Sequence, residues 1–477
     1  MSSLKQQTFF GVFWSAVERF SVQGIQFILS LVIARQLLPS DYGLIAMLSI
    51  FMAIAQCFIN SGFSNALIQK QERSDTDYST VFYFNIVVGV LMYLILIVVS
   101  PYISSFYNQP ILKEIIIWIG LNLVISSFAT VQRAILIINL DFKKQAFISF
   151  ISVLLSGSVA VYLALNGYGV WTLVVQDLLN GFINTLLLWI TSKWHPLFLF
   201  SISSFKELFS FGSKLLMGGL LHTIYTNLYT LVIGKVFPVK ELGLYCKASA
   251  LSQYPSVNIT GILDRVLYPV LCRLQNDNNT LTDKFYLFIR LIAFGVFPLM
   301  IGLAVLSEPL VILLLTDKWR DAVPYMQILC MAYMWDPIMR MSWNLLNVKH
   351  RSDYSLKSEI IKKIVAIIIL VISIPLGIKA MCWGLLLYSF FDLLIILQFT
   401  RIILPDVNIK NHIKNLFPII LKSLLMGVII LLFIHHITNE WIQLGGGFLL
   451  GVLSYILLSW IFHSKELVYI FNLIKKS

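Results

Sequence analysis

The sequence predicts an all-α membrane protein with about 14 transmembrane helices. Three observations lead to this fold class. Hydrophobic residues make up 58% of the 477 residues and charged residues only 12%, which is too little polar surface to enclose a water-soluble globule. Apolar runs of about 20 residues, each long enough to cross the hydrocarbon core as a helix, recur along the chain. The turns between them are short, so no soluble domain is expected.

The predicted spans follow one another with few interruptions. They are 9–34, 44–68, 80–100, 111–138, 145–165, 169–190, 207–234, 243–268, 285–306, 321–347, 356–375, 380–401, 415–436 and 442–461. Glu18 and Arg19 interrupt the first apolar run and no small-residue cleavage site follows it, so it is predicted to be a retained span and not a signal peptide.

A segment near the N-terminus returns 200 positions later. LVIARQLLPSDYGL begins at Leu31, and LVIGKVFPVKELGL begins at Leu231. The glycine and two charged positions recur in register: Gly43 with Gly243, Arg35 with Lys235 and Asp41 with Glu241. The chain is therefore interpreted as an internal duplication.

The duplication predicts the domain organisation. Residues 1–200 and 201–405 would form two six-helix lobes, and residues 406–477 would add two helices and a cytoplasmic tail. Because the second copy begins after an even number of spans, the lobes are expected to be related by an axis along the membrane normal and to enclose a central cleft. Placing both termini in the cytoplasm puts most of the loop Lys and Arg residues on the inner side.

Charge and cysteine content exclude several other classes. The net charge of +12 is scattered among apolar runs and forms no basic stripe beside aromatic residues, which argues against a nucleic-acid partner. The five cysteines have no CxxC spacing and lie mostly inside apolar runs, so no disulfide framework, metal site or cofactor is predicted.

Several spans carry polar residues at helical spacing. Such stripes occur at Gln23 and Gln26; Gln56 and Asn60; Asn122, Ser126 and Arg133; Gln176, Asn180 and Asn184; Thr226 and Tyr229; Gln253 and Asp264; and Arg340 and Asn344. Ser, Thr, Asn and Gln also hold membrane helices together by hydrogen bonds, and any one of them can have that role alone.

Basic residues inside the spans permit two interpretations. The predicted topology places Arg19, Arg133, Lys214, Arg265, Arg290 and Arg340 mainly in the cytoplasmic half of the spans. Long side chains near a helix end can reach the interface, which suits Arg133, Arg265 and Arg290. Arg19, Lys214 and Arg340 lie deeper and favour a cavity lining, where a cationic chamber would bind an anionic head group.

Acidic residues at mid-membrane depth are also open to two interpretations. Glu18, Asp177, Asp336 and Asp392 could be structural partners of the basic residues, or sites that couple transport to a proton or another cation. Arg340 is predicted to share a helix face with Asp336.

The chain resembles a family of exporters along most of its length. TFFGVFWSAVERFSVQGIQFILSLVIARQLLPSDYGLIAM, INSGFSNALIQK, LDFKKQ, GYGVWTLV, FKELFSFGSKLL and ITGILDRVLYPVL are similar to segments of the Wzx-like exporters of lipid-linked oligosaccharide repeat units. These flippases belong to the multidrug, oligosaccharidyl-lipid and polysaccharide exporter superfamily. After Leu244 the family pattern usually has an aromatic residue, a threonine and an arginine, where this chain has Tyr245, Cys246 and Lys247.

The resemblance implies a substrate and a set of roles. It implies that an undecaprenyl diphosphate bearing a short sugar chain moves from the inner to the outer leaflet of a bacterial inner membrane by alternating access, and that a polysaccharide polymerase and export machinery are partners. The diphosphate would bind Arg19, Arg133, Lys214, Lys247, Arg265, Arg290 and Arg340. The sugars would bind Gln23, Gln26, Asn60, Gln176, Asn180, Tyr229, Gln253 and Asn344.

Two other functions remain open at this point. A drug/cation antiporter of the same superfamily would need a cavity dominated by acids and aromatic residues. A membrane polysaccharide polymerase or ligase would need a sizeable periplasmic loop with catalytic side chains, and the outer turns predicted here are short. No catalytic residue is therefore predicted.

Overall fold

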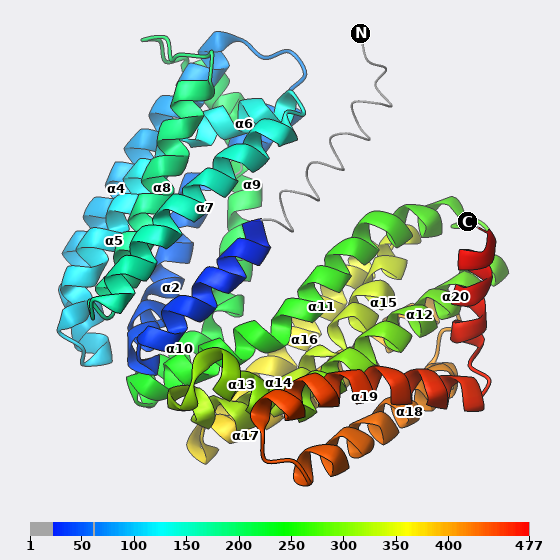
Figure 1. The fold of residues 1–477 in the computed structure, drawn as a ribbon. Helices are drawn as coiled ribbons and strands as arrows, with labels where there is room; N and C mark the ends of the chain where they lie inside the picture. The colour runs from blue at the N-terminus through cyan, green and yellow to red at the C-terminus, as the bar shows by residue number, and fades with distance from the viewer. Residues whose placement is uncertain (1–21, 61–62, 477) are drawn as a thin grey trace. The chain divides into compact units, whose positions relative to one another are not determined.

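The computed structural model describes residues 22–60 and 63–476. Throughout these ranges the regular structure is helical, which confirms the predicted fold class (Figure 1). The chain divides into two compact units, Met1–Gly243 and Leu244–Ser477. The predicted lobes 1–200 and 201–405 with the appended segment 406–477 remain a prediction.

Unit 1 begins with a helical segment at residues 22–36. The helices that follow are α2 (Pro39–Asn60), α3 (Phe63–Gln69), α4 (Asp75–Tyr107), α5 (Ile111–Ser127), α6 (Thr130–Ile138), α7 (Phe142–Leu165), α8 (Trp171–Thr191), α9 (Ile202–Thr226) and α10 (Leu228–Val236). Ser74 starts α4 with a reciprocal pair of hydrogen bonds to Asp77, which satisfies two backbone N–H groups at the helix end. Helices α4 and α5, α5 and α8, and α7 and α8 pack against each other.

Unit 2 contains most of α11 (Val239–Arg273) and all later helices. These are α12 (Asn278–Val305), α13 (Ser307–Leu315), α14 (Val323–Tyr333), α15 (Asp336–Val348), α16 (Ser352–Ser373), α17 (Ile378–Ile403), α18 (Ile409–His435), α19 (Glu440–Ile461) and α20 (Lys465–Lys476), with short 3-10 turns at Asp317–Ala322 and Ile374–Leu376. Helix α12 packs against α18, α16 against α17, and α18 against α19.

Length and hydropathy mark 8 of the described helices as able to cross a membrane, or up to 10 if each of two bent pairs is one span. The predicted count of 14 is therefore not confirmed. Of the first predicted span, 9–34, residues 9–21 lie outside the described residues and residues 22–34 are helical. The spans 243–268 and 356–375 are helical but carry several polar or charged residues. The span 321–347 is divided, because α14 ends at Tyr333 and α15 begins at Asp336.

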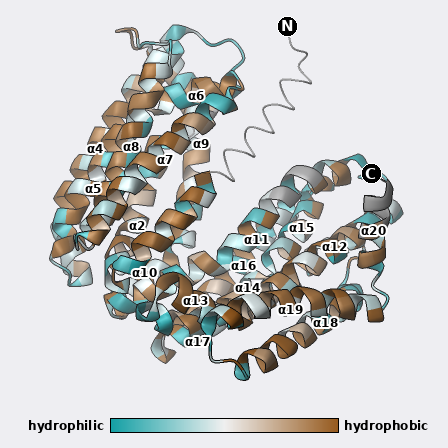
Figure 2. Ribbon diagram, in the orientation of Figure 1, coloured by the Kyte–Doolittle hydropathy of each residue, from teal (hydrophilic) through white to brown (hydrophobic). Residues whose placement is uncertain are grey.

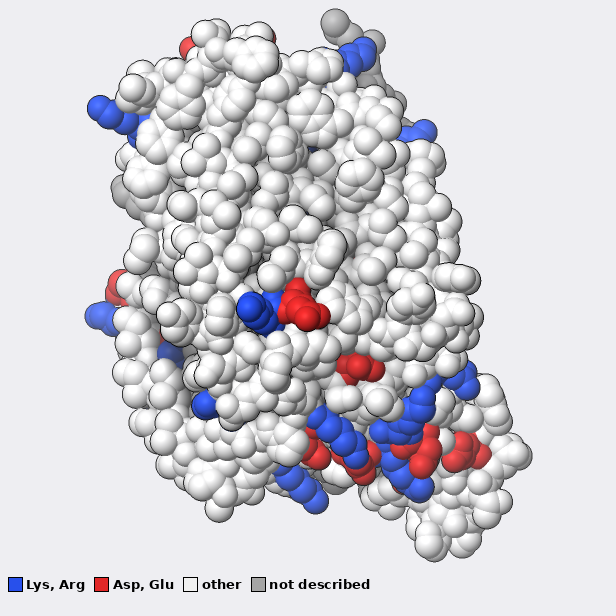
Figure 3. Space-filling view, turned by 90° about the vertical axis from the view of Figure 1, so that its left-hand side faces the viewer, with Lys and Arg blue, Asp and Glu red and all other residues white. Residues whose placement is uncertain are grey.

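The outer surfaces of these helices are apolar. Hydrophobic residues run along most of α4, α5, α18 and α19 in Figure 2, and charged side chains are sparse over a broad part of the face in Figure 3. Val98 is 68% exposed on α4 and Leu453 is 65% exposed on α19. Exposed apolar surface of this extent requires a lipid environment, so the chain is a multi-pass membrane protein.

The two copies of the duplicated segment contact each other at equivalent positions. A Cβ atom placed on Gly43 would lie 2.1 Å from the carbonyl oxygen of Val239. A Cβ atom on Gly243 would lie 1.8 Å from the carbonyl oxygen of Pro39. The contact is reciprocal. Gly43 faces Val239, which lies four residues before Gly243, and Gly243 faces Pro39, which lies four residues before Gly43. This reciprocal contact is what a local two-fold relation between the copies produces.

Candidate functional site

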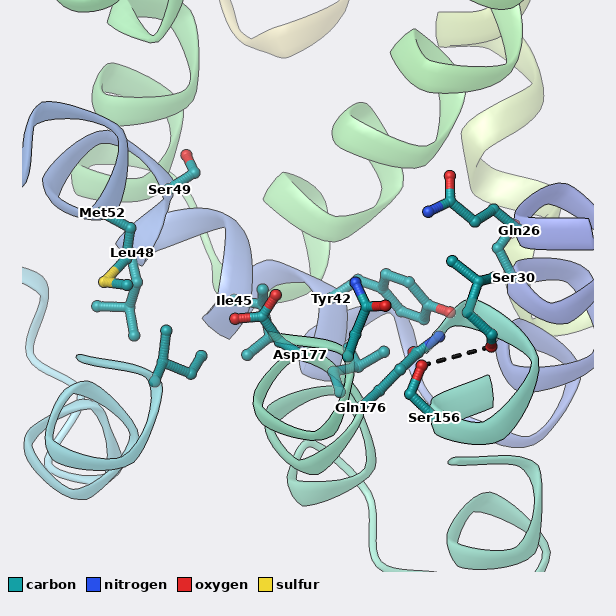
Figure 4. Close-up of a pocket in the computed structure, with 14 residues that line it drawn as sticks. Gln26, Ser30, Tyr42, Ile45, Leu48, Ser49, Met52, Ser156, Gln176 and Asp177 are labelled. Carbon is teal, nitrogen blue, oxygen red and sulfur yellow. Dashed lines mark hydrogen bonds between the residues drawn. The ribbon is translucent and has the colours of Figure 1, made fainter. Parts of the chain in front are cut away.

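A pocket of about 490 Å³, with a mostly apolar wall that also carries polar side chains, lies among the helices of unit 1 (Figure 4). Its polar lining residues are Gln26, Ser30, Tyr42, Ser49, Ser156, Gln176, Asp177 and Asn180. Among the described residues that line it, none is Lys or Arg. The volume falls within the range of about 300–1,000 Å³ that is typical of ligand pockets.

Four helical segments position these side chains. Gln26 comes from residues 22–36, Tyr42 from α2, Ser156 from α7, and Gln176 and Asp177 from α8. Three of the predicted sugar-binding residues, Gln26, Gln176 and Asn180, thus share one pocket with the predicted coupling acid Asp177. Their predicted roles remain untested by this arrangement.

Asp177 is held in place by a neighbouring helix. Nδ2 of Asn122 on α5 donates a hydrogen bond of 2.8 Å to the Asp177 carboxylate, and Asp177 is otherwise exposed toward the pocket. Gly181 allows this approach, because a Cβ atom there would lie 1.9 Å from the side-chain oxygen of Asn122. A carboxylate fixed by one amide keeps lone pairs available for a hydroxyl group or a cation.

The other polar stripes of unit 1 also meet one another. Gln56 on α2 donates a 3.4 Å hydrogen bond to Asn60 and accepts one of 3.4 Å from Ser126 on α5. Arg133 on α6 donates to Asn184 on α8 at 3.1 Å, beside a smaller cavity of about 240 Å³. The periodic spacing in the sequence therefore identified polar faces that lie against each other.

In unit 2, one carboxylate connects two predicted ligand residues. Asp264 on α11 accepts a 2.9 Å hydrogen bond from Nε of Arg340 and one of 2.7 Å from Nδ2 of Asn344. The Arg340 guanidinium also lies 4.7 Å from the ring centre of Trp343, and its side chain is 45% exposed. Arg340 is therefore accessible although it is paired.

A second group of charges in unit 2 is buried. Lys362 on α16 lies 2.7 Å from the carboxylate of Asp392 on α17, and these side chains are only 5% and 13% exposed. Glu359 lies 3.5 Å from the same ammonium. Lys362, Glu359 and Asp392 thus form one charged cluster between α16 and α17, whereas the other predicted coupling acid of unit 2, Asp336, stands at the start of α15.

The remaining predicted residues are dispersed. Arg290 lies 3.4 Å from Glu466, Lys247 is buried with its ammonium 6.0 Å from the Trp319 ring centre, and Gln253 is exposed on α11. Residues at intermediate exposure are Gln23 and Tyr229. Glu18 and Arg19 lie outside the described residues, and the side chains of Lys214 and Arg265 are outside the described set as well.

The sequence did not predict the interhelical contacts of Asn122, Asp264 and Lys362. Asn122 and Asp264 were recognised as members of polar stripes, but their partners on other helices were not predictable from spacing within one helix. Lys362 was missed although an ionisable residue inside the span 356–375 carries the same signal as Asp336 or Arg340.

Comparison with known proteins identifies the family. Residues 32–324 match the model of a family described as polysaccharide biosynthesis protein. The lipopolysaccharide biosynthesis protein WzxC of Escherichia coli (strain K12) is 27% identical over 76% of this chain and 74% of that protein. The teichuronic acid biosynthesis protein TuaB of Bacillus subtilis (strain 168) is 25% identical over 74% of each chain.

Solved structures show the same fold. The lipid II flippase MurJ in an inward closed conformation has a TM-score of 0.73 and 15% identity, covering 94% of this chain and 98% of that chain. An inward-facing multidrug resistance MATE family transporter of the MOP superfamily has a TM-score of 0.61 and 14% identity, covering 80% and 95%. The predicted resemblance to Wzx-like exporters is confirmed, and this chain belongs to the polysaccharide biosynthesis protein family of membrane proteins.

Proposed function

We propose that this protein is a flippase that carries undecaprenyl-diphosphate-linked oligosaccharide repeat units from the inner to the outer leaflet for surface polysaccharide assembly. The observation that carries the proposal is the pocket of unit 1, which places amides and a carboxylate among membrane-spanning helices. Such groups are costly in lipid and persist where they contact a polar ligand or water. Membership of a polysaccharide biosynthesis family supports a saccharide as that ligand.

The sugar part of the cargo suits unit 1. Gln26, Gln176 and Asn180 offer amide donors and acceptors, and Asp177 offers an acceptor for hydroxyl groups. With no Lys or Arg among its described lining residues, this pocket suits a neutral sugar better than a diphosphate. Gln23, Asn60, Tyr229, Gln253 and Asn344 are proposed as further sugar contacts.

The diphosphate requires basic groups, and Arg340 is the best supported of them. Its Nε atom donates a hydrogen bond to Asp264, which orients the guanidinium, and the side chain is 45% exposed. Arg19, Arg133, Lys214, Lys247, Arg265 and Arg290 complete the proposed set. The acids Glu18, Asp177, Asp336 and Asp392 are proposed to couple the cycle to a cation.

The membrane potential would assist the proposed direction. Each negative charge that moves outward across an inside-negative membrane gains about 2.3 kcal/mol per 100 mV. Positively charged side chains that moved with the diphosphate would offset part of this gain, which leaves a role for a counter-moving cation. The proposal places the protein in a bacterial inner membrane with both termini in the cytoplasm, next to the polymerase and export machinery.

The proposed function is tested by deleting the gene and locating the lipid-linked oligosaccharide. We expect it to accumulate on the cytoplasmic leaflet, where a membrane-impermeant glycosidase added from outside cannot reach it. Accumulation on the outer leaflet would contradict transport and would point to a polymerase or ligase that consumes the same lipid.

Replacing Arg340 with glutamine is expected to reduce polysaccharide export at least tenfold while the protein remains in the membrane. The physical reason is the loss of a charge-assisted contact worth roughly 1.5–3 kcal/mol. Export is measured as surface polysaccharide per unit of membrane protein, with Arg401→Gln, an exposed arginine at the end of α17, as the matched control. Normal export by the Arg340 variant would remove this residue from the diphosphate site.

Replacing Asp177 with asparagine is expected to lower export by about tenfold with little change in stability, because Asn122 can still donate to the amide oxygen at position 177. Asp75→Asn, at an exposed position at the start of α4, is the control for a lost carboxylate. Equal export by both variants would show that the unit 1 pocket does not contact the cargo through its carboxylate.

A drug/cation antiporter is a second candidate, favoured by one observation. The unit 1 pocket is lined by Asp177 and the aromatic residue Tyr42, and none of its described lining residues is Lys or Arg. A carboxylate and an aromatic ring are groups that bind a cationic drug. If Asp177→Asn abolished resistance to a cationic dye and left polysaccharide export intact, this second function would replace the first.

A further inference from the structure

A second pocket lies within unit 2, away from the residues that line the unit 1 pocket. Its volume is about 340 Å³, and α12, α18 and the junction of α19 with α20 form its walls. The charged side chains that line it are Arg290, Lys414, Lys422, Lys465 and Glu466. Four cationic groups thus surround one carboxylate, and the pocket has an excess of positive charge.

The Glu466 carboxylate forms an ion pair with one of the four cations, Arg290. Glu466 lies 3.4 Å from Nε of Arg290, and the Glu466 side chain is 8% exposed. The Arg290 guanidinium also donates to the side-chain oxygen of Asn415, at 3.5 Å. Arg290 is therefore held at the pocket wall with its orientation fixed from both sides.

The other three cations lack a carboxylate in direct contact within the described residues. Lys422 is only 4% exposed and donates to the hydroxyl of Ser464, a neutral partner. Lys414 and Lys465 are exposed at the pocket. Helix α20 begins at Lys465, so the positive end of its dipole adds to the same field. A buried ammonium such as that of Lys422 is stabilised by a nearby negative charge. An anion that binds in the pocket would supply that charge.

The rim of the pocket is apolar and exposed. Leu421 is 42% exposed and Phe462 is 56% exposed, and Pro418 lines the same pocket. On α20, Val468 and Phe471 are 55% and 61% exposed, although that helix also carries Lys465, Lys475 and Lys476. Exposed apolar residues on a helix that begins at an exposed lysine suit a helix that lies in the interfacial plane of a membrane.

We propose that this pocket binds the phosphate head group of an anionic phospholipid, with its acyl chains over Leu421 and Phe462. The inference goes beyond the proposed transport function, since it concerns a resident lipid and not the cargo, and it assigns Arg290 to that lipid instead of the diphosphate. A basic pocket between membrane helices, open to the interface and bordered by apolar side chains, offers the charge and the surface that such a lipid requires. A free phosphate ion would use the basic groups and leave the apolar rim uncovered.

The test is native mass spectrometry of the full-length protein released from detergent with phosphatidylglycerol or the zwitterionic phosphatidylethanolamine. We expect phosphatidylglycerol to be retained in preference, and its retention to fall at least fivefold in Lys414→Gln and in Lys422→Gln. Lys284→Gln, which removes an exposed lysine of α12 that does not line the pocket, is expected to bind as the parent does. Equal retention in all three variants would overturn the proposal.

Two further arms separate the possible sources of phosphate. Inorganic phosphate at millimolar concentration is expected not to displace the lipid, because it gains nothing from the apolar rim; full displacement would show that the pocket binds a free anion. Geranylgeranyl diphosphate tests for a polyprenyl diphosphate, and displacement of the lipid by it at an equal concentration would assign the pocket to the cargo. Because Lys414 is exposed, Lys414→Gln keeps the test valid even if Lys422→Gln fails to fold.

Discussion

Replacing Gly243 with alanine is expected to cause a large loss of folded protein, and Gly43→Ala a similar one. The added methyl group would lie 1.8 Å from the Pro39 carbonyl oxygen in the first variant and 2.1 Å from the Val239 carbonyl oxygen in the second. Both obstacles are backbone atoms, so no side chain can rotate away. Overpacking of this kind costs roughly 1–3 kcal/mol or more, and the backbone contact places these variants at the upper end.

The measurement is the fraction of monodisperse protein that remains in detergent after heating. Gly218→Ala and Gly295→Ala are the controls, because a Cβ atom at either position has no neighbour within 4 Å. Both lie inside helices, where alanine stabilises relative to glycine by about 1 kcal/mol, so the controls should be neutral or more stable than the parent. If Gly43→Ala and Gly243→Ala matched these controls, the close contact between the two copies would be refuted.

Replacing Lys362 with methionine is expected to destabilise unit 2 strongly. The change leaves the Asp392 carboxylate buried without the ammonium that lies 2.7 Å from it. Breaking one side of a buried ion pair typically costs about 3–5 kcal/mol. Asp392→Asn alone should have a smaller effect, because Glu359 still lies 3.5 Å from the Lys362 ammonium.

The double variant Lys362→Met with Asp392→Asn separates structure from coupling. It removes both charges, so we expect thermal stability to recover by more than half of the loss seen in either single variant. If Asp392 also couples transport to a cation, export should stay low in this stable double variant. The exposed pair Arg351 and Asp353 is the control, and Arg351→Met should change stability little. Failure of the double variant to recover would show that the two groups are not energetic partners.

Much of the fold could be predicted because the bilayer constrains it. A run of apolar residues that crosses hydrocarbon has to satisfy its own backbone hydrogen bonds, so such runs become helices, as α4, α12 and α18 do. The positions at which a predicted span divides into two helices were harder to predict. The span 111–138 divides into α5 and α6 with a bend of 43°. No proline lies at that break, so the sequence contains no signal that predicts it.

The candidate site was predictable to the extent that helical spacing determines it. Residues at intervals of three or four share one face, so Gln176, Asn180 and Asn184 were grouped on one stripe. The structure places Gln176 and Asn180 around one pocket and Asn184 beside another. Spacing within one helix carries no information about the helix opposite. The pairing of Arg340 with Asp264 instead of Asp336, and of Asp392 with Lys362, depends on contacts between helices that are distant in sequence.

The reciprocal contact of Gly43 and Gly243 bears on how the chain arose. Each copy of the duplicated segment contains both partners of the contact. These are the glycine, Gly43 or Gly243, and the carbonyl group of the residue four positions before it, Pro39 or Val239. Two such copies would join through identical surfaces without any new complementarity. The present chain carries both halves of this self-complementary contact within one polypeptide.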